Sequence, residues 1–315
     1  MRITPFATGN PKRTFNPNPS TRARPNMTLA ERAVRSLAAM KPNPQPPLLR
    51  LRHPLVLMHG FGVLAAFGRG GMLHEQAMHL RKRGVWAFAP NVSPYHTVSA
   101  RADQWGARLT HILRETDADQ VHLVAHSMGG LDARFLVSRR GWAERVATLT
   151  TVSTPHRGTS AADFVMEQPD RLIALLAAAA EWLGRQILPD DDASDFTRAV
   201  RELRPAHVQG TFNPATPDAP SVDYRSYAGR AGRGTDVPIN PFFRLLNHVI
   251  YEREGVNDGY VATESARWGD FRGALDADHA RQVGLAAGGL RRVPAADAFY
   301  RTLAQDLADE EDDRR

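Results

Sequence analysis

Short apolar runs alternate with amphipathic stretches from Leu55 onward. Runs rich in apolar and β-branched residues predict strands, which we place at Leu55–His59, Val85–Ala89, Val121–Ala125 and Val146–Val152. Between these runs, apolar residues recur at helical spacing, which predicts helices over Met72–Arg83, Ser99–Glu115 and Met128–Arg140. Strands that alternate with helices are typical of a mostly parallel sheet covered by helices on both faces. The sequence therefore predicts an α/β fold with its main domain at 51–315.

The alternation stops after Ser160 and resumes near Val222. Helical patterns in this interval cover Pro169–Leu188 and Asp195–Leu203. We interpret the interval, about 160–220, as a helical cap or lid inserted between two strands of the sheet. The remaining predicted elements are a strand at Val222–Ala228, a helix at Pro241–Glu252 and a last helix from Ala295 toward Asp306.

Residues 1–50 form a basic, proline-rich arm with too little apolar surface for a stable core. Thr28 and Glu31 have capping-box spacing, which predicts one short helix in the arm. Between Met1 and Arg52 the chain has ten basic residues and one acidic residue, whereas the whole chain has a net charge of +6. The body is therefore mildly acidic. This argues against nucleic-acid binding, because such domains carry their basic residues on the folded face.

Composition narrows the chemistry. Hydrophobic residues make up 42% and charged residues 23% of the 315-residue chain, as in ordinary globular proteins. The chain has no cysteine, so a thiol nucleophile is excluded and serine remains the main nucleophilic option. The first thirty residues contain no apolar run of signal-peptide length, and Glu181 and Arg185 interrupt the Leu/Ala-rich stretch Leu172–Leu188. We therefore predict no transmembrane segment and expect a cytoplasmic location.

Ser127 directly follows the third predicted strand and precedes a predicted helix, which is the context of a nucleophile elbow. The sharp turn requires small residues two positions before and after the serine, and Ala125 and Gly129 occupy these positions. The turn exposes the hydroxyl and directs the backbone N–H of Met128 toward a developing oxyanion. We predict Ser127 as the nucleophile and Met128 as an oxyanion donor.

A glycine-rich loop, His59-Gly60-Phe61-Gly62, follows the first predicted strand. Hydrolases with a nucleophile elbow place their second oxyanion donor in a loop of this kind. Taken alone, the loop could equally be a turn without a chemical role. Together with the elbow it predicts the backbone N–H of Phe61 as the second donor.

The base should follow the serine along the chain in this fold, and four histidines do so: His156, His207, His248 and His279. The first two precede the expected late strands. His248 falls within a predicted helix among apolar neighbours, where a packed core histidine is expected. We therefore predict His279, on a loop, as the general base.

Asp258 is the predicted acid, because Asn257-Asp258-Gly259 marks a tight turn between the serine and the histidine. The alternatives lack such a context or are expected to be solvated loop charges; they are Asp223, Asp236, Asp270, Asp276 and Asp278. In this arrangement His279 takes the proton of Ser127 during attack on an ester carbonyl, and Asp258 orients the imidazole. The mechanism needs neither a cofactor nor a metal.

Four stretches of the chain resemble the bacterial true lipases, the triacylglycerol lipases of the Pseudomonas and Burkholderia type. They are Leu55–Gly62, the elbow with Gly130 and Leu131, Thr154–Phe164 and Val256–Val261. The resemblance implies an α/β-hydrolase fold, with Ser127, Asp258 and His279 as triad and with Phe61 and Met128 as oxyanion donors. Ala125 replaces the glycine usual in these lipases, a change also seen in small Bacillus lipases. The basic arm has no counterpart in the family.

These lipases typically bind calcium near the catalytic histidine, through an aspartate two positions after it. Arg281 occupies that position here, and a guanidinium repels the ion. The sequence therefore predicts no metal site, and we expect Arg281 to pair with Asp236 instead.

The function predicted from the sequence is hydrolysis of carboxylic esters with apolar acyl chains, by a triacylglycerol lipase or carboxylesterase that meets its substrate at a lipid–water interface. The alternatives on the same scaffold are an esterase for short chains, a thioesterase and a polyester depolymerase, because the fold does not choose among them. A non-catalytic binding protein of the same fold, and an arm that tethers the chain to an anionic surface, are further alternatives.

Overall fold

The computed structural model describes residues 3–4, 48–62, 71–187, 195–285 and 293–313. The chain divides into two units, Met1–Pro5 with Leu48–Arg315 and Phe6–Pro47. The second unit, which contains the predicted arm helix, lies outside the described residues. No helix in the described ranges is long and apolar enough to cross a membrane.

The first unit is built on a seven-stranded sheet in the order β1-β7-β6-β5-β4-β2-β3. The strands from β2 to β7 pair in parallel, and β1 pairs antiparallel with β7 at one edge. Their bounds are β1 Ile3–Thr4, β2 Leu55–Met58, β3 Ala87–Phe88, β4 Val121–His126, β5 Val146–Val152, β6 Asp223–Arg230 and β7 Asp270–Asp276. The predicted α/β class is confirmed.

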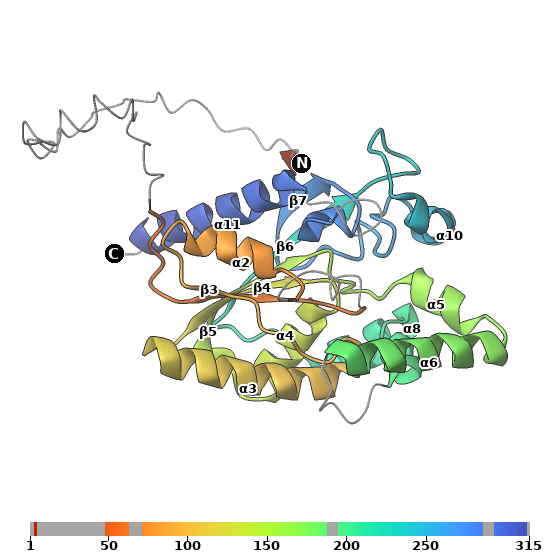
Figure 1. Cartoon of the computed structure of the whole chain (residues 1–315), viewed down its shortest axis with the longest axis horizontal. Helices are drawn as coiled ribbons and strands as arrows, with labels where there is room; N and C mark the ends of the chain where they lie inside the picture. Colours follow the sequence, from red (N-terminus) through yellow and green to blue (C-terminus); the bar gives the residue numbers. More distant parts are fainter. Residues whose placement is uncertain (1–2, 5–47, 63–70, 188–194, 286–292, 314–315) are drawn as a thin grey trace, which may run out of the picture. The chain divides into compact units, whose positions relative to one another are not determined.

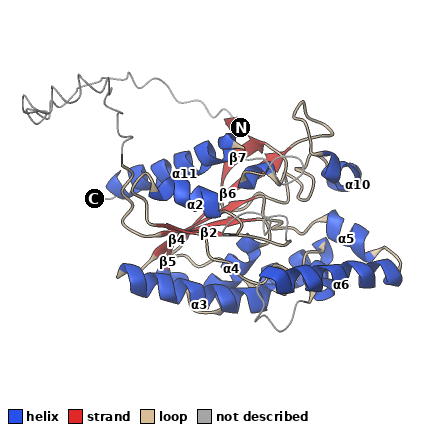
Figure 2. Cartoon of the chain, viewed as in Figure 1, coloured by secondary structure: helices blue, strands red, loops and turns tan. Residues whose placement is uncertain are grey.

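Helices cover both faces of this sheet. Figure 1 shows α2 and α11 on one side and α3 and α4 on the other, and Figure 2 shows the strands between these two helical layers. The bounds are α2 His74–Arg81, α3 Val98–Thr116, α4 Gly129–Arg139 and α11 Pro294–Asp313. Alternate residues of β2 enter two different cores: Leu57 packs in the core that contains Leu303, and Val56 packs in the core that contains Trp105. This two-sided burial explains the continuous apolar runs of the sequence.

The predicted strands β2, β4, β5 and β6 are observed within one or two residues, but β7 was missed. Its sequence carries Asp270 and Arg272 on exposed positions, so it lacks the apolar run that marks a strand buried on both faces. The two-residue strand β1 is too short to leave any sequence pattern. β3 is limited to Ala87–Phe88, shorter than predicted.

The free edge of the sheet at β3 is blocked by local hydrogen bonds. The backbone N–H of Ala87 donates to Val85 O at 2.9 Å, and Arg81 Nε donates to Ala87 O at 2.6 Å. Since an edge strand pairs with other chains through such free groups, their use within the molecule protects β3 from pairing.

Between β5 and β6 the chain is helical, with α5 Ser160–Met166, α6 Asp170–Ile187, α7 Phe196–Glu202, α8 Pro205–His207, a π-helical turn at Val208–Phe212 and α9 Asn213–Ala215. The helix α5 was not predicted from the sequence. Thr159 caps it, because its hydroxyl accepts the Ala161 N–H. Helix α10 Arg244–Glu254 follows β6 and begins after a 3₁₀ turn, Pro241–Phe243.

Candidate active site

Ser127 lies at the carboxyl end of β4 in a left-handed backbone conformation, with φ of 58°. A residue other than glycine is strained at this φ, and hydrogen bonds of the Ser127 backbone, on both sides of the residue, maintain the conformation. The Ser127 N–H donates to Val152 O at 2.9 Å, and its carbonyl accepts from the Thr154 hydroxyl at 2.7 Å. The strand-to-helix turn with a strained serine at its apex has the geometry of a nucleophile elbow.

The elbow is packed too closely for larger residues. A Cβ atom on Gly129 would lie 2.8 Å from His59 O, and one on Gly130 would overlap the Thr154 hydroxyl. Gly129 lets α4 begin directly against the end of β2 and the loop after it, and Gly130 lets it begin against the segment after β5. The sequence requirement for small residues after the serine therefore has a steric cause.

The glycine-rich loop after β2 lies against the elbow. A Cβ atom on Gly60 would lie 2.6 Å from Ser127 Cβ and 2.8 Å from Met128 N. The structure thus brings together the two segments that carry the predicted oxyanion donors, Phe61 and Met128. The Phe61 ring packs edge to face on Tyr95 at 5.1 Å and also contacts Phe196 of α7.

A buried ion pair fixes this loop to the nucleophile helix. Arg101 on α3 pairs with Asp132 on α4 at 2.8 Å, and both side chains are fully buried. Arg101 also donates to His59 O at 2.7 Å, while His59 Nε2 accepts the Val92 N–H at 3.1 Å. Burial, and then the nearby Arg101 charge, lower the pKa of His59 to about 3, so this imidazole is neutral.

Arg101→Met is expected to lower the free energy of unfolding by about 3–5 kcal/mol, because Asp132 would be left buried without its partner. Burial raises the pKa of Asp132 to about 6, although Arg101 opposes the rise. Without Arg101 the pKa rises further, so the loss of stability should widen as the pH rises above about 6. Urea unfolding at several pH values measures this loss. The control Arg140→Met removes an exposed pair with Asp103, and a comparable loss there would contradict the explanation.

The predicted acid and base lie side by side. His279 Nδ1 lies 2.8 Å from Asp258 Oδ2, and the His279 backbone N–H donates to Asp258 O at 2.9 Å. Asp258 is fully buried, whereas the His279 side chain is 11% exposed. The carboxylate therefore holds the inner nitrogen of the ring and leaves Nε2 for a reacting group.

Several donors keep Asp258 ionised in spite of its burial. Burial by itself raises the pKa of Asp258, but His279 and the backbone N–H groups of Val261 and Tyr260 hold it below its ordinary range. These two N–H groups donate to Oδ1 at 2.9 and 3.0 Å. A buried carboxylate with this many donors is an acceptor at neutral pH and can fix the tautomer of His279.

The imidazole of His279 lies between two other rings. The ring of His126, the residue before Ser127, lies 4.4 Å away, and the ring of Tyr260 lies 5.1 Å away. Burial, and then the neighbouring His279, lower the pKa of His126 well below its usual value, so His126 is neutral. This contact brings the acid–base pair to the nucleophile elbow, although Ser127 and His279 are far apart in the sequence.

The other candidate histidines lie elsewhere. His156 is fully buried and hydrogen-bonds to the Thr151 hydroxyl at 3.0 Å. His207 lies in α8 and is half-buried. His248 is exposed on α10 and contacts Arg233, so the expectation of a packed core histidine is wrong. Tyr251 and Glu252 pair with the same arginine, and this polar neighbourhood is not visible in the apolar spacing of the helix.

Of the alternative acids, Asp278 is fully buried, which corrects the expectation of a solvated loop charge. Its Oδ1 accepts the Arg281 N–H at 2.9 Å, and its Oδ2 accepts the Asn240 N–H at 3.2 Å. Asp276 is half-buried and pairs with Arg230 at 2.7 Å. Neither carboxylate takes the place of Asp258 at the imidazole.

The residues around Asp278 do not fit a calcium ion. Arg281 lies on Asp278, with Nε 3.5 Å from Oδ2, and not on Asp236 as expected from the sequence. Both carboxylate oxygens of Asp278 already accept backbone N–H groups, and the adjacent guanidinium repels a cation. No group of three or more potential metal ligands occurs in the described parts of the chain.

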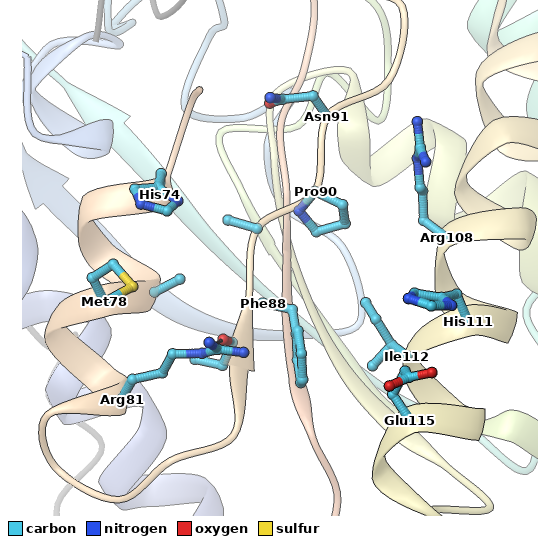
Figure 3. A pocket seen from close by; sticks show the side chains of 13 residues that line it. His74, Met78, Arg81, Phe88, Pro90, Asn91, Arg108, His111, Ile112 and Glu115 are labelled. Carbon is cyan, nitrogen blue, oxygen red and sulfur yellow. Dashed lines mark hydrogen bonds between the residues drawn. The ribbon is translucent and has the colours of Figure 1, made fainter. Parts of the chain in front are cut away.

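A pocket of about 530 Å³ lies apart from this site, along β3. Figure 3 shows His74, Met78 and Arg81 of α2 facing Arg108, His111 and Glu115 of α3 across it. Ser127, Asp258 and His279 do not line this pocket, so it does not supply the catalytic groups.

Two residues of the site were not found from the sequence. Arg101 contacts the glycine-rich loop after β2, and Gln282 donates to Asp258 Oδ2 at 2.8 Å. The only signal for Gln282 was its position three residues after His279. No motif marks Arg101, because it reaches the loop from a different helix.

The chain is similar to triacylglycerol lipases in sequence. It is 32% identical over 209 residues to triacylglycerol lipase 2 of Saccharomyces cerevisiae, a match that covers 64% of this chain and 58% of the yeast protein. It is 27% identical over 282 residues to a triacylglycerol lipase of Pseudomonas fragi, with 79% of this chain and 94% of the relative covered. The chain thus spans less than two thirds of the yeast relative. The predicted resemblance to bacterial lipases is confirmed.

Solved structures support the fold. Staphylococcus hyicus lipase superimposes with a TM-score of 0.63 at 19% identity, over 87% of this chain and 99% of that one. A metagenomic carboxyl esterase also superimposes with a TM-score of 0.63, at 18% identity, over 86% of this chain and 79% of that one. The family model described as a domain of unknown function (DUF7379) matches residues 27–217, and the chain therefore belongs to this family.

Proposed function

We propose that this chain hydrolyses carboxylic esters of apolar acyl chains, with Ser127 as nucleophile, His279 as general base and Asp258 as the acid that orients it. The observation that carries the proposal is the Asp258–His279 hydrogen bond of 2.8 Å, beside a strained serine at a strand-to-helix turn. Lipase relatives and lipase-like folds support ester hydrolysis by an α/β hydrolase.

The reaction follows from these positions. His279 Nε2 removes the Ser127 proton as the oxygen attacks the ester carbonyl, and the backbone N–H groups of Phe61 and Met128 stabilise the oxyanion. The imidazolium then protonates the leaving alcohol, which departs and leaves an acyl-enzyme. Water attacks this ester with His279 again as base, and release of the carboxylic acid restores Ser127.

Helix α6 supports an apolar substrate and a lid. Its inner face carries Ala180, which packs with Tyr95 in a cluster that Phe61 of the oxyanion loop also contacts. Its outer face exposes Leu175 to 65% and Trp182 to 58%. Exposed apolar side chains of this size mark surfaces that bind a partner or a lipid. We infer that α6 covers the site and moves at a lipid–water interface.

The activity is expected to rise sharply when an ester substrate passes its solubility limit, because the exposed face of α6 gains a lipid surface to bind. Nitrophenyl esters of increasing acyl length and emulsified triglyceride measure this rise. Leu175→Glu should abolish the rise and leave hydrolysis of dissolved butyrate esters unchanged. A smooth saturation curve through the solubility limit would favour an esterase.

Short-chain esters, thioesters and polyesters are the alternative substrates. A carboxyl esterase has the same fold, and thioesters or polyesters need the same acyl-enzyme chemistry. A strong preference for chains of about four carbons or fewer would assign the chain to the esterases. Lack of reaction with any ester and with a fluorophosphonate would identify a non-catalytic binding protein. The cytoplasmic location stays a prediction, which cell fractionation tests.

The melting temperature and the activity are expected to be the same with excess EDTA and with added calcium. The reason is that Arg281 lies on Asp278, where a cation would be repelled. A ligand that binds only the native state raises the melting temperature, so thermal melts test this directly. A calcium-dependent rise of several degrees, removed by the chelator, would show that other oxygens build a site.

A further inference from the structure

Gln282 shares an oxygen of Asp258 with the proposed catalytic histidine. It belongs to a short 3₁₀ turn, Arg281–Val283, and is fully buried. Its Nε2 donates to Asp258 Oδ2 at 2.8 Å, and His279 Nδ1 lies 2.8 Å from the same oxygen. The Gln282 amide and the His279 ring therefore both interact with the negative charge on Asp258 Oδ2.

The backbone of β6 leaves room for this contact. A Cβ atom on Gly229 would overlap Gln282 Nε2 and would lie 2.9 Å from Asp258 Cβ. Any residue other than glycine at this position would push the amide away from the carboxylate. The placement of Gln282 thus depends on a glycine from a different strand.

Apart from this contact, the amide makes one longer hydrogen bond, from Nε2 to Ala277 O at 3.4 Å. Gln282 Oε1 is buried and has no hydrogen-bond partner among the residues that the structure describes. Turning the amide over would place that oxygen against the carboxylate, so the contact with Asp258 fixes its orientation. A buried acceptor without a partner opposes folding, and an apolar side chain of similar size would avoid it. The shorter of its two donor contacts is the one with Asp258, and an apolar side chain of the same size could not make it.

We propose that Gln282 is a positioning residue of the triad, which holds Asp258 Oδ2 at His279 and shares the negative charge of that oxygen with the imidazole. This inference rests on the proposed function. Three titratable groups face the imidazole: Asp258, His126 of β4 and Tyr260. His126 and Tyr260 are neutral near pH 7, since burial lowers the pKa of the first well below its usual value and raises the pKa of the second to about 12. Of the three, Asp258 supplies the charge.

Gln282→Met removes the amide donor and keeps the volume of the side chain. The full charge of Asp258 then stabilises the imidazolium, so the acid limb of the kcat/KM profile should move to higher pH by about half a unit. Without the amide a smaller fraction of the molecules should have Asp258 in place at His279, which should lower kcat about tenfold at the plateau with KM unchanged, although the bond is stronger in the molecules that form it. A pH series with a soluble nitrophenyl ester measures both effects.

Gln76→Met is the matched control. Gln76 is also buried, and its Nε2 donates to the neighbouring Val283 O at 3.3 Å. It does not touch Asp258, so its replacement should lower the melting temperature and leave the pH profile in place. A Gln282→Met profile that superimposes on wild type, or an equal shift in Gln76→Met, would overturn the proposal.

A second measurement does not depend on activity. In the Ser127→Ala protein, the proton between His279 and Asp258 should give a low-field NMR signal, which Gln282→Met should move further downfield as that bond strengthens. An unchanged signal would overturn the role of Gln282. Wild-type protein that fails to react with a fluorophosphonate would instead overturn the proposed function, and the NMR comparison would still decide the role of Gln282.

Discussion

Ser127→Ala is expected to lower the kcat of ester hydrolysis by about 10³- to 10⁶-fold while the protein stays folded. The hydroxyl is the only atom group lost, and the backbone hydrogen bonds that hold the elbow, to Val152 and from Gly130, do not involve it. Binding and the oxyanion donors would remain and would account for residual activity. Steady-state kinetics with a soluble ester, together with circular dichroism and a thermal melt, measure the effect.

Ser153→Ala is the matched control for this result. Ser153 follows the neighbouring strand β5, is fully buried and also has a positive φ, of 48°. Within the described part of the chain its hydroxyl has no hydrogen-bond partner. The variant should therefore keep nearly full activity. Retention of more than about a tenth of wild-type kcat by Ser127→Ala would disprove the assignment of the nucleophile.

Asp258→Asn is expected to lower kcat by about 10⁴-fold, with little change in KM. An amide can accept from only one side, and its NH₂ group would face either His279 Nδ1 or the backbone N–H groups at Oδ1. The imidazole would then lose the tautomer that leaves Nε2 free to accept a proton. Kinetics at several pH values, with a thermal melt to verify folding, measure the loss.

The control for the acid is Asp276→Asn. Asp276 ends the adjacent strand β7 and pairs with Arg230 at 2.7 Å, away from the imidazole. Its replacement removes a half-exposed ion pair, so stability should change by less than about 1 kcal/mol and activity should persist. If Asp276→Asn were the inactive variant, the acid would have been assigned to the wrong strand end.

The sequence by itself determined the features that depend on local chain geometry. Ser127 was predicted as the nucleophile because an elbow needs an apolar strand, a small residue after the serine and a following helix, all within a few positions. Phe61 was predicted as an oxyanion donor from the glycines around it. The strands β2, β4 and β5 were predicted because burial on both faces leaves an uninterrupted apolar run.

The spacing of residues alone could not identify Asp258 and His279 as the proposed acid and base. Chain order limited the candidates, and the tight turn at Asp258 favoured one of them. The structure places the two residues at hydrogen-bond distance. It also buries Asp278 and exposes His248, both against expectation. Burial of a loop residue depends on the segment that packs over it, such as Asn240 on Asp278, and no local pattern encodes that segment.

Only the tertiary structure decided which distant groups support the site. Arg101 reaches the glycine-rich loop after β2 from α3, and Gln282 reaches Asp258 across the backbone of Gly229. Such contacts join residues that are adjacent in space because parallel strands end at the same edge of the sheet. A side chain whose role is to orient another group, from a distant part of the chain, leaves no periodic pattern or motif in the sequence. The proposed nucleophile could therefore be predicted from the chain, whereas the groups that orient its proposed partners depended on how the strands were ordered.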